Sequence, residues 1–185
     1  MNPRTVKHAG LALAIYLAVF LVAYLEFPRR WLGASVDLLP ALFVYVGTSC
    51  GLAATAGLAI LGGVLHDSLS ANPLGVSILP LFLVGAAVWS NKHNLLNEQR
   101  FAQVSLGLIA SAAAPLISLF LLYVLGAQPL IGWISLWQWL AMALAGALMA
   151  PVWFGVFHRL DRALFYPAAS ESGFRPDREL DRGRS

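Results

Sequence analysis

Long apolar segments separated by short polar breaks run through the whole chain. Six of these segments stand out, at about residues 9–26, 32–48, 51–66, 73–90, 101–126 and 133–158. At 1.5 Å of rise per helical residue, each is about long enough to cross a hydrocarbon core of roughly 30 Å, although the third is short. The segments show no alternation of apolar and polar residues, which argues against membrane-spanning strands. Membrane-spanning helices are therefore the expected structure, because a helix makes the hydrogen bonds of its backbone internally and needs no water in the lipid.

Composition supports the same fold class. The chain has 185 residues, of which 59% are hydrophobic and 11% are charged, whereas a soluble domain carries roughly 25% charged residues. A domain of this size has too little interior to hide so much apolar surface from water. The single cysteine, Cys50, excludes an internal disulfide and a zinc site built from cysteines. We therefore expect an all-α integral membrane protein, with a six-transmembrane-helix bundle over residues 1–166 and a flexible cytoplasmic tail over 167–185.

The distribution of positive charge predicts the topology. With six spans and a cytoplasmic N-terminus, ten of the twelve Lys and Arg residues fall on the cytoplasmic side, and only Arg29 and Arg30 fall outside. Five spans would instead place the six arginines from Arg159 to Arg184 outside. The positive-inside rule thus favours a multi-pass protein with both termini in the cytoplasm. The net charge of +3 comes mostly from the chain ends, so it gives no reason to expect a nucleic-acid partner.

Two carboxylates stand at the edges of apolar segments. Asp37 opens the second predicted span, and Asp67 closes the third within the stretch "GVLHDSLSANPLGVS". The predicted topology places both near the outer side of the membrane, on adjacent antiparallel helices. They are therefore able to face each other or to share a partner, and His66 would neighbour both. Ionisable residues at such positions are functional candidates, because burying a charge in a bilayer is costly.

Several roles are open for Asp67. It can stay hydrated at the headgroup boundary and accept hydrogen bonds from the N–H groups of residues 68–71, it can organise helix contacts, or it can couple to proton or ion movement. The chain has no H-E-x-x-H or G-x-S-x-G pattern, and no second histidine at helical spacing from His66. We therefore expect no enzyme activity, no catalytic residue, no metal and no cofactor.

Small residues recur every four positions along the third predicted span. They are Gly51, Thr55, Ala59 and Gly63, with Gly57 widening the stripe. Such a stripe lets another helix approach closely. It serves either packing within the bundle, which is the commoner use, or the interface with a partner.

Four prolines fall inside predicted spans, at Pro40, Pro80, Pro115 and Pro151. Each removes a backbone hydrogen bond and can bend or interrupt its helix. Interrupted helices line the substrate cavities of transporters, but bending alone is the expectation that we favour.

The block from Asp37 to Gly75, "DLLPALFVYVGTSCGLAATAGLAILGGVLHDSLSANPLG", resembles the core of the rod shape-determining protein MreD family. That family has an acidic residue opening an apolar span, then a glycine-rich span, a terminal Asp, a short polar turn and a Leu-Gly pair. The matching motif residues here are Asp37, Gly51, Gly57, Gly63, Asp67, Ser70, Pro73, Leu74 and Gly75. The last span, "ALMAPVWFGVFHRLDRALF", also resembles the closing helix of the family.

The resemblance implies a non-enzymatic scaffold of the bacterial cell-elongation machinery in the inner membrane. Proteins of this family support rod shape and lateral peptidoglycan synthesis together with MreC, a bitopic partner. RodA and its partner transpeptidase, and indirectly the MreB filament, belong to the same machinery. Contact with membrane lipid is expected, and a homo-oligomer is compatible with the stripe.

The alternative is a vitamin-binding membrane subunit of an energy-coupling-factor transporter, because the MreD family resembles the fold of that S-component. Asp37, Asp67 and Asn72 would then be ligand contacts. The later spans offer no second polar cluster to complete a selective site, although ligand pockets need few polar groups.

Overall fold

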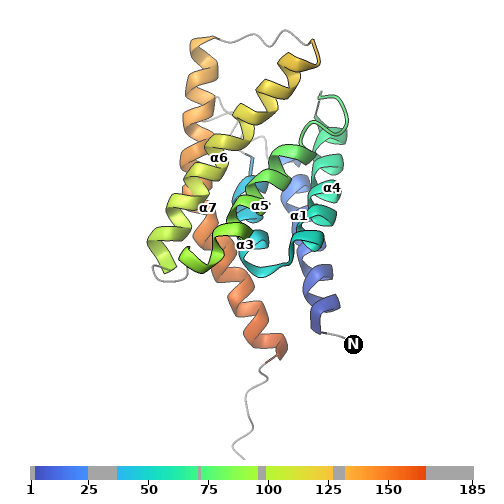
Figure 1. Cartoon of the computed structure of the whole chain (residues 1–185), viewed down its shortest axis with the longest axis vertical. Helices are drawn as coiled ribbons and strands as arrows, with labels where there is room; N and C mark the ends of the chain where they lie inside the picture. The colour runs from blue at the N-terminus through green and yellow to red at the C-terminus, as the bar shows by residue number, and fades with distance from the viewer. Residues whose placement is uncertain (1–2, 25–36, 71, 96–98, 127–131, 166–185) are drawn as a thin grey trace, which may run out of the picture.

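The computed structural model describes residues 3–24, 37–70, 72–95, 99–126 and 132–165 (Figure 1). These residues form six helices and, among themselves, no strand. The helices are α1 (Pro3–Tyr24), α3 (Leu39–Ser49), α4 (Leu52–Leu69), α5 (Ile78–Leu95), α6 (Gln99–Val124) and α7 (Trp133–Phe165). The prediction of an all-α fold is confirmed.

Four of the described helices are long and apolar enough to cross a membrane. They are α1, α4, α6 and α7, whereas α3 and α5 are shorter apolar helices. The 11 residues of α3 extend only about 16 Å at 1.5 Å per residue, which is less than a hydrocarbon core of roughly 30 Å. The predicted second span starts at residue 32, and residues 25–36 lie outside the described part of the chain. The count of six spans therefore stays a prediction.

Two helix starts differ clearly from the predicted spans. The first predicted span starts at 9, whereas α1 begins at Pro3. The fourth predicted span starts at 73, whereas α5 begins at Ile78, because residues 73–77 form a turn. Pro80 is thus in the first turn of α5. Pro40 lies at the N-terminus of α3, where its missing N–H costs no helical bond. Of the four, Pro115 and Pro151 lie in the interior of their helices, beyond the first turn, and both helices continue past them.

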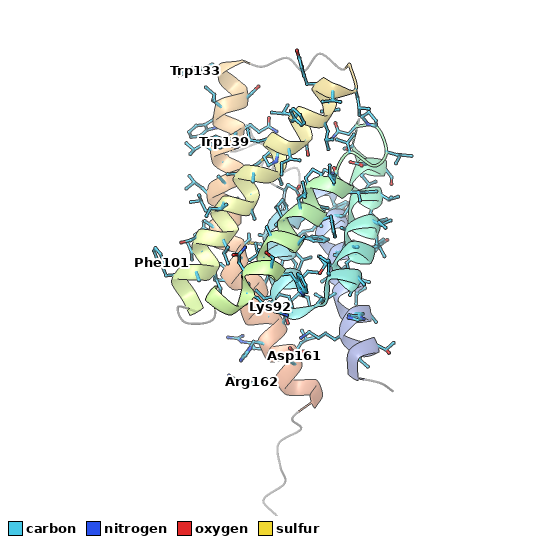
Figure 2. All side chains as sticks on the ribbon, viewed as in Figure 1. Lys92, Phe101, Trp133, Trp139, Asp161 and Arg162 are labelled. Carbon is cyan, nitrogen blue, oxygen red and sulfur yellow. The ribbon has the colours of Figure 1, made fainter. Side chains whose placement is uncertain are left out.

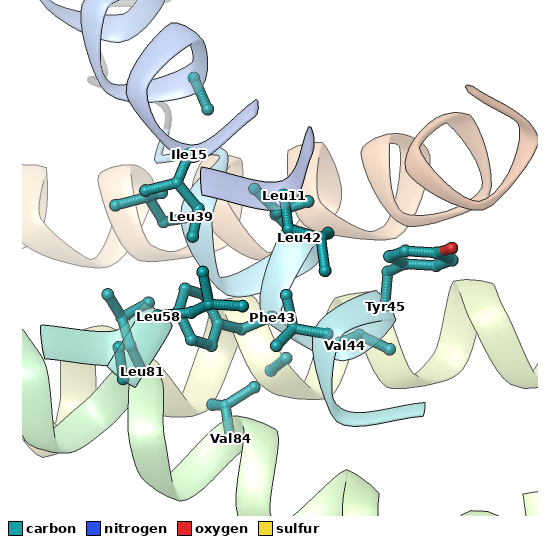
Figure 3. Packing of buried hydrophobic residues seen from close by; sticks show 14 of the residues in the cluster. Leu11, Ile15, Leu39, Leu42, Phe43, Val44, Tyr45, Leu58, Leu81 and Val84 are labelled. Carbon is teal, nitrogen blue, oxygen red and sulfur yellow. The ribbon is translucent and has the colours of Figure 1, made fainter. Parts of the chain in front are cut away.

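The shortest helix occupies the centre of the bundle. Every residue of α3 from Leu39 to Gly47 is buried, and α3 contacts all five of the other described helices. A helix that is apolar on every side belongs in such a position. Figure 3 shows its side chains packing against Leu11 and Ile15 of α1, Leu58 of α4, and Leu81 and Val84 of α5.

The two ends of the bundle carry different polar groups. The first turns of α1 and the last turns of α7 lie at one end, where Lys7 Nζ is 3.5 Å from Asp161 Oδ2. The turn between α4 and α5 lies at the other end (Figure 1). Lys92, Asp161 and Arg162 gather near the first end, and Trp133 stands at the far end of α7 (Figure 2).

Candidate functional site

Asp67, in the last turn of α4, is the most deeply buried carboxylate that the structure describes. The residue is only 2% exposed. Its Oδ2 accepts hydrogen bonds from the backbone N–H groups of Gly75, at 2.8 Å, and Ser77, at 3.1 Å. Its Oδ1 accepts a hydrogen bond of 2.5 Å from the hydroxyl of Ser77. Three donors from one turn therefore satisfy a carboxylate that has almost no contact with solvent.

The turn is shaped so that its N–H groups point back at Asp67. Gly75 has φ of +98°, a conformation that residues with a side chain rarely adopt. The N–H of Val76 bonds to the carbonyl of Pro73, and that of Ile78 bonds to the carbonyl of Gly75. The chain thus reverses within a few residues and enters α5. The N–H groups of Gly75 and Ser77, which precede the helix, are left for the carboxylate.

His66 links the turn to the start of α3. Its Nδ1 lies 3.1 Å from Ser77 Oγ and 3.8 Å from Asp67 Oδ1. Its Nε2 lies 3.8 Å from Asp37 Oδ2. Asp37 in turn accepts a hydrogen bond of 2.9 Å on Oδ1 from the N–H of Leu39, the first residue of α3. We call Asp37, His66, Asp67, Gly75 and Ser77 the Asp67 network.

The structure brings together the two carboxylates that the sequence singled out. Asp37 and Asp67 share His66 as a neighbour, as the antiparallel arrangement suggested. Of the roles left open for Asp67, the hydrated carboxylate that caps its own turn differs from the structure in two details. The Asp67 side chain bonds to residues 75 and 77 and not to the described N–H groups of 68–70, and it is buried, not hydrated. The reason is that the turn folds over the end of α4 and replaces water with its own donors.

Sequence reasoning missed Ser77. It lies eleven positions after His66, it is 8% exposed, and its hydroxyl joins His66 to Asp67. No local motif identifies it, because the contact depends on how the turn folds back. A serine, a histidine and an aspartate in series have the composition of a nucleophilic triad. Here, however, the Ser77 hydroxyl and the N–H groups of Gly75 and Ser77 bond to Asp67, and the N–H groups of Val76 and Ile78 bond to carbonyl groups of the turn.

Other motif residues of the turn lie at the surface. Pro73 is exposed, and Leu74 has 72% of its surface exposed. Leu69, at the end of α4, is 61% exposed. The inner side of the turn therefore holds the hydrogen-bonded polar groups, whereas its outer side carries the exposed side chains of Leu69 and Leu74.

The small-residue stripe of α4 divides between two faces. Thr55 and Ala59 are fully buried, and a Cβ built on Gly63 would stand 2.7 Å from the backbone nitrogen of Ile78. Gly51 and Gly57 are exposed, with no neighbour within 4 Å of a built Cβ. One part of the stripe thus packs inside the bundle, and Gly57 faces outward.

A second close helix contact joins α6 to α7. A Cβ on Gly107 would lie 2.5 Å from the Cβ of Ala150 and from the carbonyl oxygen of Gly146. A Cβ on Gly146 would collide with the hydroxyl of Ser111. Trp139 of α7 also donates its indole N–H to the carbonyl of Ala112, at 2.9 Å. These helices therefore form a tight hairpin.

The opposite end of the bundle holds a polar contact between α1, α3 and α7. Asp161 lies 3.5 Å from both Lys7 Nζ and the hydroxyl of Tyr45. The Tyr45 ring stacks on Phe157 with centroids 4.6 Å apart. Lys7 and Asp161 are about a third exposed, so the pair contributes little to stability, about 1 kcal/mol or less.

No group of three or more His, Cys, Asp and Glu side chains in the described part of the chain is arranged to hold a metal ion. The chain matches no family model, no curated protein and no solved structure in the three comparisons made. The physical properties of the Asp67 network and of the helix faces therefore carry the functional argument.

Proposed function

We propose that this protein is a non-enzymatic inner-membrane scaffold of the bacterial cell-elongation machinery, similar to MreD. In this proposal six helices cross the membrane, both termini lie in the cytoplasm, and the turn between α4 and α5 faces the outer side. The protein binds a bitopic, MreC-like partner and thereby supports rod shape and lateral peptidoglycan synthesis.

The observation that carries the proposal is the convergence of the motif residues in one corner. Asp37 stands far before Asp67 and Gly75 in the sequence block that resembles MreD, yet all three belong to the Asp67 network. The polar groups of this corner are bonded to one another, which suits a structural role.

The outward face of α4 is the surface that we assign to the partner. Gly57 is exposed and has open space around it, and Ile60 and Val64 continue the same face with 54% and 40% of their surfaces exposed. In lipid, helices associate where a small residue lets backbones approach and neighbouring apolar side chains interlock. A single membrane helix of a bitopic partner fits such a face.

Depletion in a rod-shaped bacterium that carries the gene tests the function. We expect cells to become round, and we expect the protein to co-purify with an MreC-like bitopic protein. Co-purification with an ATPase-bearing module, together with a retained vitamin, would instead identify the transporter subunit and overturn the proposal.

Photo-crosslinking tests the surface. A photoreactive amino acid at position 57 is expected to capture the bitopic partner, whereas the same group at Ile109, an exposed residue of α6, serves as a matched lipid-facing control. Equal capture at both positions, or capture only at 109, would remove the partner role from α4.

A further inference from the structure

One exposed face of α7 changes from apolar to basic along its length. Leu148 and Val152 have 73% and 49% of their surfaces exposed. Gly155 is exposed with open space around it, and Arg159 and Arg162 are exposed as well. Because these residues follow one another at intervals of four, three, four and three positions, they share one side of the helix. We call these five residues the exposed α7 face.

The two arginines differ from the other described Lys and Arg side chains, because those lie against the protein itself. Lys7 lies 5.9 Å from the centroid of a tyrosine ring in α3, and Lys92 lies 5.4 Å from that of a tryptophan ring in α5. The guanidinium groups of Arg159 and Arg162 make no ion pair, hydrogen bond or ring contact within the described part of the chain. They are therefore available to an anion from outside the chain.

Asp161 stands between the two arginines in the sequence but faces another side of α7. Its carboxylate lies 3.5 Å from both Lys7 Nζ and the hydroxyl of Tyr45, toward α1 and α3. Residues one or two positions apart on a helix do not face each other, whereas residues three apart do. Arg159 and Arg162 thus form a pair of positive charges near the end of α7 (Figure 2), and Asp161 does not bridge them.

The length of the exposed α7 face fits one leaflet of a bilayer. Leu148 and Arg159 are 11 positions apart, which is about 16 Å at 1.5 Å per residue, and half of a hydrocarbon core of roughly 30 Å is about 15 Å. Arg159 is also the first Asp, Glu, Lys or Arg of α7. It therefore stands at the level of the lipid headgroups when Leu148 lies near the middle of the bilayer.

We propose that the exposed α7 face binds one anionic phospholipid. The lipid phosphate binds Arg159 and Arg162, and one acyl chain lies along the apolar part of the face. Guanidinium groups form paired hydrogen bonds with phosphate, and two arginines three positions apart have Cβ atoms about 5–6 Å apart, close enough to share one phosphate. Gly155 leaves room beside the helix for the glycerol part of the lipid. The site does not depend on the scaffold function.

The charge of the face selects the kind of lipid. Two unpaired guanidinium groups are complementary to a headgroup with net negative charge, whereas a zwitterionic headgroup brings a positive charge of its own. The rest of the face, Leu148, Val152 and Gly155, offers no polar side chain. An acyl chain therefore covers it without leaving any polar side chain of the face unpaired.

A photoreactive amino acid at Val152 tests the site in nanodiscs that contain phosphatidylethanolamine and, as the minor component, phosphatidylglycerol. Mass spectrometry of the adducts is expected to show enrichment of phosphatidylglycerol at position 152. The same group at Ile109, an exposed residue of α6, is expected to capture the two lipids in their bulk proportion. Equal proportions at both positions would overturn the proposal. A protein adduct at 152 in native membranes would identify a protein interface and would overturn it too.

Two double variants test whether the site depends on these arginines. Native mass spectrometry with added phosphatidylglycerol is expected to show that Arg159→Gln with Arg162→Gln lowers the affinity about tenfold or more. The matched control, Lys7→Gln with Lys92→Gln, removes the same charge from the same end of the bundle and should lower the affinity much less. Equal losses would show a general effect of positive charge, and no site.

Gly155→Leu tests the face without changing its charge. Nothing lies within 4 Å of a Cβ at this position, so the melting temperature should stay close to the native value. The leucine fills the space assigned to the glycerol part, and the affinity for phosphatidylglycerol is expected to fall. An unchanged affinity would show that the arginines act without the rest of the face, and the proposed site would be wrong.

Discussion

Gly63 of α4 and Ile78 of α5 meet so closely that a methyl group on Gly63 would stand 2.6 Å from Cγ1 of Ile78 and 2.7 Å from its backbone nitrogen. The first residue of α5 thus rests directly on the backbone of α4. This contact sets where the chain enters α5 after the turn held by Asp67. It therefore couples the small residues of α4 to the Asp67 network.

Gly63→Ala is predicted to destabilise the protein by about 1–3 kcal/mol, because backbone atoms of Ile78 have to move. Gly57→Ala is the matched control on the same helix. Its added methyl group meets open space, and alanine is the better helix former by about 1 kcal/mol. The free energy of unfolding in detergent is measured for both variants. Equal values would contradict the close contact between Gly63 and Ile78.

Asp67→Asn is predicted to cost less stability than Asp67→Leu. The amide oxygen can still accept from the N–H groups of Gly75 and Ser77, and the amide N–H can donate to Ser77 Oγ. We expect a loss of about 1–3 kcal/mol for Asn and a larger loss for Leu, which removes the acceptor that the N–H groups of Gly75 and Ser77 and the Ser77 hydroxyl share. Equal losses, measured by thermal unfolding, would show that the negative charge itself is required.

Gly146→Ala is predicted to loosen the hairpin of α6 and α7, because its methyl group would collide with the hydroxyl of Ser111. Overpacking of this kind typically costs about 1–3 kcal/mol. Gly155→Ala, on the same helix with nothing within 4 Å, should leave the melting temperature nearly unchanged. A reversed order of the two variants would be incompatible with the observed helix contact.

Cys50, between α3 and α4, is predicted to react slowly with maleimides in the folded protein. Burial raises the pKa of the Cys50 thiol, and the positive charge of Lys7 offsets part of this rise. The thiolate is the nucleophile, so labelling should accelerate about tenfold per pH unit below the pKa and should be faster after denaturation. Because folding raises the pKa of the Cys50 thiol, the buried neutral thiol contributes to folded stability at pH values below the ordinary thiol pKa. This contribution is lost as the pH rises from the ordinary thiol pKa through the raised one.

The Lys7→Met variant checks the electrostatic part of this prediction. Removal of the positive charge should raise the pKa of Cys50 further and slow labelling at a given pH. A labelling rate in the folded native protein that equals the rate after denaturation would contradict the burial of Cys50.

The helical fold class followed from local information, and the structure agrees. Apolar runs without alternation and the low charge content determined the class, since each helix satisfies its own backbone. Asp37, His66 and Asp67 were also recognisable, because ionisable groups are conspicuous at the edges of apolar segments. Their mutual proximity followed from the antiparallel order of neighbouring segments.

Only the tertiary structure determined which groups satisfy these charges. Ser77 completes the Asp67 network because the turn folds back over α4, and that fold depends on the positive φ of Gly75 and on the fit of Ile78 against Gly63. The stripe of α4 was visible in the sequence, but the division between buried Ala59 and exposed Gly57 was not. Spacing along a helix defines its faces, whereas the packing of neighbouring helices decides which of those faces is covered.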